Sequence, residues 1–260
     1  QLRCSAVSLH SCTSMAKAPL RIAILGGGIF AREAHAPVFI DLANSGLVEV
    51  VACWSRSKDS ADQLAQIYAS KLADGRAPPA FGGDAAVDDL LARSDISAFI
   101  VVLPINLQDK YAVRCMRAGK HVLTEKPIAG SIADAREAIR VYEQCKSTVH
   151  YCVAENYRFE GALRIAADEV RSSCGQVLTV NMTAFVPFTR DSKYEKTQWR
   201  RDSEHIGGVL LDSAVHFMAG LQLVLGAKIT AVSTITTKKS DHLPQVSPLP
   251  FLFQILQPPL

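Results

Sequence analysis

A glycine turn near the start of the chain places the strongest constraint on the fold. Residues 26–31 read GGGIFA and fit the pattern GxGxx(G/A). The turn follows Leu20–Leu25, an apolar run typical of a buried strand, and precedes residues 29–43, which are compatible with a helix and carry Pro37 as a kink or local start. Strand, tight turn and helix in this order predict a dinucleotide-binding unit.

Each position of the turn has a physical role in such a unit. Gly26 permits the sharp turn, Gly28 lets the backbone approach a pyrophosphate, and the small Ala31 lets the helix pack on the strand. Backbone amides at the helix start, around Ile29 and Phe30, then face the anion. We therefore assign Gly26, Gly28, Ile29 and Phe30 to cofactor binding. The alternative is a glycine-rich turn in an unrelated α/β protein.

Strand-like and helix-like segments alternate as far as residue 154. Further strands are predicted at residues 47–53, 80–81, 96–103, 121–124 and 148–153, and further helices at residues 60–72, 87–92, 107–118 and 132–145. The run at residues 96–103 is apolar throughout, as a parallel strand covered on both faces should be. The alternation predicts an α/β fold with a doubly wound parallel (Rossmann) sheet.

The pattern changes after residue 154. A helix at residues 161–170 is followed by residues 176–185, in which apolar and polar side chains alternate as in a strand with one wet face. A helix holding Asp212 and His216 and a strand at residues 229–237 come next. These segments predict a second α+β domain with a largely antiparallel, incomplete sheet. The predicted divisions are a Rossmann domain at residues 17–154 and a partial substrate domain at residues 155–240.

The two ends of the chain are expected to lie outside both domains. Residues 1–16 are rich in Ser and Cys and lack acids, and we expect Met15 to be the true start. This leader is interpreted as translated upstream sequence, with an organelle transit peptide as the alternative. Residues 241–260 hold five prolines and neither hydrophobic period, so they are expected to be a non-family tail.

Composition excludes several classes of protein. The chain has 260 residues, of which 48% are hydrophobic and 20% charged, and a formal net charge of +3, too small to suggest a nucleic-acid partner. Its best apolar run stops at Pro104 and is too short to span a membrane. Seven scattered cysteines without a CxxC pair predict reduced thiols, a cytoplasmic location and no metal site.

Two further motifs complete a family pattern. Residues 118–127 read AGKHVLTEKP and residues 207–216 read GGVLLDSAVH. With the glycine turn, they make residues 20–238 resemble the glucose–fructose oxidoreductase / inositol dehydrogenase superfamily of NAD(P)-dependent enzymes. The resemblance implies hydride transfer between nicotinamide and a hydroxyl-bearing carbon of a sugar, cyclic polyol or diol.

The same residues suggest this chemistry by themselves. Oxidising a carbinol requires a base for the hydroxyl proton, and His216 suits that role. Asp212 lies one helical turn earlier and is placed to orient the imidazole. Lys126 ends a strand at the carboxyl edge of the sheet, where it can polarise the substrate oxygen and help seat the nicotinamide. The alternatives are a surface Asp–His pair, a pair of metal ligands without a third, and a solvated lysine.

Three more positions are expected near the reactive end of the cofactor. Pro127 restricts Lys126 to extended conformations, with a cis peptide bond as one option. Glu125 either anchors the cofactor or only neutralises neighbouring charge. Pro104 opens a loop that contacts the nicotinamide end in the family, although Gln108 stands where the family pattern has histidine.

The end of the second strand decides between NAD and NADP. An NAD enzyme usually places an acid there, on the ribose 2′-hydroxyl. This chain has Ser55, Arg56 and Ser57, and no acid before Asp59. The two hydroxyls can donate to a 2′-phosphate while Arg56 pairs with it, so we expect NADP rather than NAD. The alternative is a solvated loop with two cations.

The resemblance also suggests substrate contacts, an assembly and a second functional class. Tyr157 and Arg158 match a family segment near the substrate, with junction core as the alternative for the aromatic residues of this segment. The open second sheet is the face through which family members form homo-oligomers. Because family members continue through more strands, the alternative to an enzyme is a catalytically silent, dinucleotide-binding regulatory protein.

Overall fold

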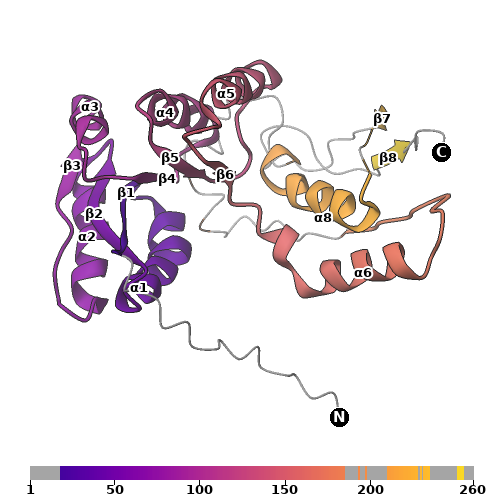
Figure 1. Ribbon diagram of the computed structural model, residues 1–260, viewed down its shortest axis with the longest axis horizontal. Helices are drawn as coiled ribbons and strands as arrows, with labels where there is room; N and C mark the ends of the chain where they lie inside the picture. The colour runs from indigo at the N-terminus through magenta and orange to yellow at the C-terminus, as the bar shows by residue number, and fades with distance from the viewer. Residues whose placement is uncertain are drawn as a thin grey trace, which may run out of the picture.

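The computed structural model describes residues 18–184, 193, 197, 210–227, 229, 231–234 and 251–254. These residues form two lobes, which follow one another along the chain and are joined after strand β6 (Figure 1). The first lobe is a sheet covered by helices. The second contains two longer helices and a pair of short strands.

Six parallel strands form the sheet of the first lobe, in the order β3-β2-β1-β4-β5-β6. They are β1 (Leu20–Leu25), β2 (Val48–Ser55), β3 (Ala80–Gly82), β4 (Ala98–Val101), β5 (His121–Thr124) and β6 (Tyr151–Val153). The chain moves outward from β1 to β3 and then returns to the other side of β1 at β4, so the topological switch point lies between β1 and β4. This confirms the doubly wound parallel sheet predicted from the sequence.

Helices cover both faces of this sheet because its strands are apolar on both sides. Ile22 and Ile24 pack in one core cluster with Phe39, whereas Ala23 and Leu25 pack in a second cluster with Tyr111. This alternation is the two-residue period of a strand buried on both faces. The first face is covered by α1 (Ala36–Asn44) and α2 (Lys58–Lys71), both of which contact η1 (Ala31–His35). The second face is covered by α3 (Ala85–Ala92), α4 (Ile105–Arg117) and α5 (Ile132–Cys145).

The helix after the glycine turn begins as a π-helical segment. The segment η1 leads directly into α1, and Pro37 occupies the first turn of α1, as the predicted local start requires. The π-helical geometry itself was not predicted. His35 is the last residue of this segment.

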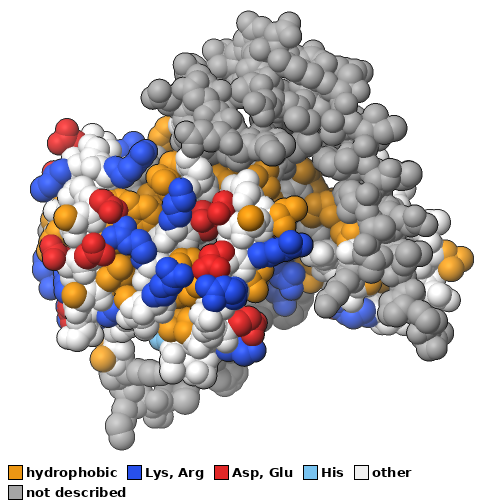
Figure 2. Space-filling view, turned by 90° about the horizontal axis from the view of Figure 1, so that it is seen from above, with side chains coloured by type: hydrophobic (Ala, Val, Ile, Leu, Met, Phe, Trp, Pro, Cys, Tyr) orange, Lys and Arg blue, Asp and Glu red, His pale blue; other side chains and the backbone are white. Residues whose placement is uncertain are grey.

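The outer surface over α3, α4 and α5 carries charges of both signs side by side (Figure 2). Arg114 of α4 pairs with Asp84 and Asp88, and Glu137 of α5 pairs with Arg140. Such exposed pairs contribute little to stability individually, but they keep this face free of a large field of one sign.

Several expected absences concern only the part of the chain that the structure describes. Within it, no helix combines the length and apolarity needed to cross a bilayer. The same residues contain no cluster of three or more His, Cys, Asp or Glu side chains arranged to bind a metal ion. The five cysteines among them are free thiols.

The second lobe contains four helical segments and two short strands among the described residues. Its elements are η2 (Asn156–Phe159), α6 (Gly161–Ser172), η3 (Leu210–Ala214), α8 (Val215–Leu225), β7 (Ala231–Thr234) and β8 (Phe251–Gln254). Helices α6 and α8 pack closely at Gly220, where a Cβ atom would lie 2.9 Å from Leu163 Cδ1. Strands β7 and β8 pair antiparallel, in agreement with the sheet type predicted for this domain. However, β8 lies within residues 241–260, which were expected to lie outside both domains, so the sheet reaches further along the chain than predicted.

One predicted strand of this lobe is not formed. The alternation of residues 176–185 predicted a strand, but residues 176–184 have no regular secondary structure, and the Leu178 side chain is 83% exposed. A strand needs a hydrogen-bonded neighbour as well as an alternating pattern, and β7 pairs with residues 251–254 instead. Phe185, the loop that holds Trp199, and the pair Gly207 and Gly208 lie outside the described residues.

Candidate active site

The glycine turn closes tightly against the neighbouring strand. Gly26 has a φ of 128°, and a Cβ atom there would lie 2.0 Å from the carbonyl oxygen of Val102, just after β4. A Cβ atom on Gly27 would lie 2.4 Å from the carbonyl oxygen of Ser60, in α2. Only glycine fits at these two positions. The need for Gly27 was not recognised from the sequence, because it depends on a helix that begins about thirty residues later.

Gly28, unlike Gly26 and Gly27, is not packed against other parts of the chain. It is exposed, and no atom lies within 4 Å of the position a Cβ would take. Its carbonyl accepts from the amide of Arg32, so the helix starts immediately after it, with Ile29 half-buried and Phe30 40% exposed. An open backbone surface at the start of a helix fits a pyrophosphate group. The contacts assigned to Ile29 and Phe30 stay predictions.

The proposed ribose site lies at the carboxyl end of β2. Ser55 pairs with Gly82 of β3, Arg56 is exposed, and Ser57 begins α2 without making a side-chain capping bond. The three side chains therefore stand at the edge of the sheet where a dinucleotide would lie.

An acid does follow the neighbouring strand, although the sequence suggested none at this site. Asp84 follows β3 and accepts hydrogen bonds from Arg114 (2.7 Å) and the Tyr111 hydroxyl (2.8 Å). The Arg114 guanidinium, with help from Tyr111, holds the pKa of the Asp84 carboxyl below its ordinary value. The Asp84 carboxylate is thus already engaged by a cation of the protein.

The segment after β4 supplies a contact that the sequence left in doubt. Pro104 precedes α4, and Gln108 in the first turns of that helix is 1% exposed. The Gln108 amide donates to the carbonyl oxygens of Glu125 (3.2 Å) and Pro127 (2.9 Å). Gln108 therefore contacts the loop that carries Lys126. The expected contact between Pro104 and nicotinamide stays a prediction.

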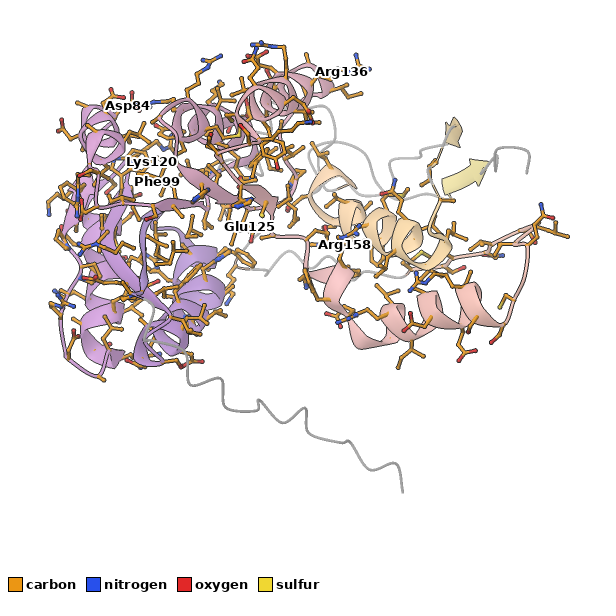
Figure 3. All side chains as sticks on the ribbon, viewed as in Figure 1. Asp84, Phe99, Lys120, Glu125, Arg136 and Arg158 are labelled. Atoms are coloured by element: carbon orange, nitrogen blue, oxygen red, sulfur yellow. The ribbon has the colours of Figure 1, made fainter. Side chains whose placement is uncertain are left out.

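The loop after β5 carries Glu125 and Lys126, and the peptide bond between Lys126 and Pro127 is cis. Glu125 is buried and lies on the side of the first lobe that faces the second (Figure 3). The Glu125 Oε1 atom lies 2.7 Å from His35 Nε2, and its Oε2 accepts from the amide of Lys126 at 3.1 Å. Both carboxylate oxygens of Glu125 thus contact groups of the protein, and a contact between Glu125 and the cofactor stays a prediction.

Lys126 reaches across to the second lobe. Its Nζ atom donates to the Oδ1 atom of Asp212 (2.9 Å) and to the backbone oxygen of Asp212 (2.7 Å). The two side chains are only 15% and 18% exposed. Lys126 is therefore not a solvated lysine at a strand end, and Asp212 is not part of an exposed helical pair.

His216 pairs with an acid that the sequence analysis did not select. Its Nδ1 atom lies 2.7 Å from Oε1 of Glu155, which also accepts from the amide of Tyr157 at 3.0 Å. Glu155 is 7% exposed. The imidazole-orienting role that helical spacing suggested for Asp212 is filled by Glu155, because Asp212 turns toward Lys126. An acid two residues after the end of a sheet strand was the available signal for Glu155.

The sheet explains why these pairs lie together. Thr124 at the end of β5 pairs with Val153 at the end of β6, and the amide of Ala154 donates to the carbonyl of Thr124. Lys126 and Glu155 therefore leave the sheet from adjacent strands at the same edge. Their partners Asp212 and His216 come from η3 and the start of α8. An ion pair between Lys126 and Asp212 and a hydrogen bond between His216 and Glu155 thus lie at one place.

The two candidate substrate residues have different surroundings. The Tyr157 ring stacks on the His216 ring, with 4.7 Å between centroids and 21° between planes, and meets Phe217 edge-on. Arg158 is exposed at the near end of the second lobe (Figure 3). Phe159 is 74% exposed, so the expectation that it forms junction core is wrong. Tyr157 supports the imidazole, and a substrate contact of either residue stays a prediction.

Two family models match the chain. One, described as an oxidoreductase family with an NAD-binding Rossmann fold, covers residues 20–152. The other, described as the C-terminal alpha/beta domain of an oxidoreductase family, covers residues 171–248. The second match includes the start of the proline-rich segment, and β8 lies just beyond it.

Individual relatives agree with these models. The dehydrogenase FPY6 of Fusarium mangiferae is 38% identical over 226 residues, which are 85% of this chain and 63% of the relative. A dTDP-3,4-didehydro-2,6-dideoxy-alpha-D-glucose 3-reductase of Streptomyces violaceoruber is 29% identical over 213 residues, 81% of this chain and 56% of the relative. The chain therefore spans about three fifths of the length of these curated relatives.

A solved structure shows the same fold. The oxidoreductase TM0312 of Thermotoga maritima is 28% identical and superimposes with a TM-score of 0.76, covering 91% of this chain and 69% of that chain.

Proposed function

Because the chain belongs to the oxidoreductase family of glucose–fructose oxidoreductase and inositol dehydrogenase, we propose that it is an NADP-dependent oxidoreductase. It transfers a hydride between nicotinamide and a hydroxyl-bearing carbon of a sugar, cyclic polyol or diol. The observation that carries this proposal is the meeting of two contacts at the carboxyl edge of the sheet, the ion pair of Lys126 with Asp212 and the hydrogen bond of His216 with Glu155.

His216 is the base in this proposal. A carboxylate can only accept hydrogen bonds, so the ring nitrogen beside Glu155 carries a proton and Nε2 is left to accept one. In the oxidation direction Nε2 takes the proton of the substrate hydroxyl, and in the reduction direction it returns that proton to the carbonyl oxygen. Glu155 stabilises the imidazolium that forms, and stacked Tyr157 limits rotation of the ring.

Lys126 acts on the substrate oxygen. Its ammonium group is held by two oxygens of Asp212, and an ammonium group carries three protons, so one donor remains for a ligand. A hydrogen bond from Lys126 favours the alkoxide-like charge that develops as the hydroxyl loses its proton.

The coenzyme would be held by the glycine turn and the end of β2. The open surface at Gly28 binds the pyrophosphate, while Ser55, Arg56 and Ser57 donate hydrogen bonds to the 2′-phosphate that distinguishes NADP. Arg114 already engages Asp84, which lowers the repulsion that a second phosphate would meet. When bound, the nicotinamide ring supplies the hydride acceptor or donor.

The substrate class is a carbohydrate-like alcohol or the corresponding ketone. Support comes from the family resemblance and from the relative in Streptomyces violaceoruber, whose name describes reduction of a keto sugar linked to dTDP.

We also propose that the protein acts in the cytoplasm on small molecules, binds neither nucleic acid nor membranes, and forms a homo-oligomer through the second-lobe sheet. Light scattering after gel filtration tests the assembly.

The function is tested in two steps. The first is an increase in NADPH fluorescence when the protein is added, with NADH as the comparison. The second is a screen of polyols, aldoses, diols and a nucleotide-linked keto sugar for a change in nicotinamide absorbance. We expect binding and turnover. Binding without turnover would identify a catalytically silent dinucleotide-binding protein, and absence of binding would refute the proposal.

A further inference from the structure

We propose that His35 and Gln108 are positioning residues that fix the backbone of Lys126 from two sides. The inference rests on the proposed function only in taking Lys126 as an active-site residue. Neither His35 nor Gln108 was assigned a role from the sequence. Both lie in the first lobe, on different helices, and both bond to the loop that carries Lys126.

Gln108 holds the main chain on either side of Lys126. One amide nitrogen donates to the carbonyl oxygen of the residue before Lys126 and to that of the residue after it. The side chain is almost completely buried, so water cannot replace these bonds at low cost. The buried carbonyls of Glu125 and Pro127 would otherwise lack these donors. One side chain therefore fixes both flanks of the lysine.

His35 holds the third backbone group, through Glu125. The imidazole Nε2 donates to one carboxylate oxygen, and the other carboxylate oxygen accepts from the Lys126 amide. The His35 and Glu125 side chains are only 13% and 11% exposed. The ring of His35 is itself confined, because it stacks on Phe39 and meets the edge of Phe30. This second contact restrains the Lys126 amide.

The consequence is that the Lys126 ammonium group can move only through its side-chain torsions. A group held in one orientation before the reaction loses less entropy when it meets the substrate. His35 also ends the π-helical segment that starts at the glycine turn. Through it, the backbone that faces the pyrophosphate and the backbone of the catalytic lysine are parts of one hydrogen-bonded unit.

The test uses substitutions that keep shape and remove only the donor. His35→Phe keeps both aromatic contacts, and Gln108→Met keeps the buried volume. If either variant fails to fold, His35→Leu or Gln108→Leu takes its place, since leucine has no hydrogen-bond donor. The readout is the rate at which an amine-acylating reagent labels Lys126 in the full chain, measured by mass spectrometry of the peptide that contains it. This readout requires neither coenzyme nor substrate.

We expect the His35 variant, which loses one hydrogen bond, to label Lys126 about three- to tenfold faster than the unaltered chain, and the Gln108 variant, which loses two, to label it at least as fast as the His35 variant. In turnover assays, kcat should fall by a similar factor while KM changes little. Two controls come from the same elements. His121→Phe lies at the other end of β5, and Cys115→Ala lies in the buried face of α4. Both should label at the original rate.

Two results are decisive. Labelling of Lys126 at the control rate in both donor-free variants would overturn the positioning role. If labelling rises as expected but the unaltered chain turns over no substrate, the positioning role stands and the proposed function fails. The two hypotheses are therefore tested separately.

Discussion

The two lobes differ in how completely their strand-like segments are paired and buried. In the first lobe every strand from β1 to β6 has a parallel neighbour, and the central strands are buried on both faces. In the second lobe β7 pairs with residues 251–254, and residues 176–184, which follow α6, are irregular and mostly exposed. The comparison teaches that the first lobe is a framework with its own core, whereas the second brings the imidazole of His216, the proposed base, to the edge of that framework.

The largest expected effect tests the framework itself. Phe99 in β4 is fully buried, whereas Phe159 in the second lobe is 74% exposed. Phe99→Ala should lower the free energy of unfolding by about 3–5 kcal/mol, because it leaves a cavity in the core. Phe159→Ala should lower it by less than about 0.5 kcal/mol. Urea unfolding followed by circular dichroism measures both. Equal losses would show that Phe159 packs as a core residue.

The next prediction separates binding from chemistry. His216→Ala should reduce kcat by about 10²- to 10⁴-fold, because the base for the hydroxyl proton is removed. NADPH affinity should not change, since all the proposed coenzyme contacts lie in the first lobe. Steady-state kinetics and fluorescence titration give the two quantities. A turnover rate equal to that of the unaltered chain would remove His216 from the mechanism.

Several elements of the first lobe could be predicted from the sequence because local signals determine them. Strands Leu20–Leu25 and His121–Thr124 and helix Ile132–Cys145 have the predicted bounds. Local signals determine all three: apolar runs mark the strands, and Ser131 caps the helix by accepting from the amide of Asp134. The glycine turn was equally readable, because its pattern, strand and helix are contiguous.

The sequence motifs identified three of the residues that meet at the candidate site, but not which of them form pairs. Lys126, Asp212 and His216 were selected from motifs, yet Lys126 and Asp212 are 86 residues apart, and His216 and Glu155 are 61 apart. Helical spacing favoured Asp212 as the partner of His216. Glu155 is the partner of His216 because the second lobe approaches the ends of β5 and β6, and the sequence does not show this approach.

The third prediction compares these two acids directly. Glu155→Gln should lower kcat by about a hundredfold, because an amide can present its NH₂ group to Nδ1 and so favour the wrong tautomer of His216. Asp212→Asn should act on Lys126 instead, and its loss should be smaller, because the backbone oxygen of Asp212 still accepts from Nζ. The kcat values of the two variants decide the assignment. A larger loss for Asp212→Asn would restore the pairing that the sequence suggested.

The smallest expected effect concerns the coenzyme and lies wholly in the first lobe. Arg56→Ala should weaken NADPH binding about ten- to a hundredfold, because a charge-assisted bond to the 2′-phosphate contributes about 1.5–3 kcal/mol. NADH binding should barely change, since NADH lacks that phosphate. Lys58→Ala is the matched control, because Lys58 lies two residues away but is paired with Asp62 at 2.7 Å. Fluorescence titration of both coenzymes measures the ratio. If Arg56→Ala weakened NADPH and NADH equally, the arginine would support the loop rather than select the phosphate, and the coenzyme preference would have to come from another part of the first lobe.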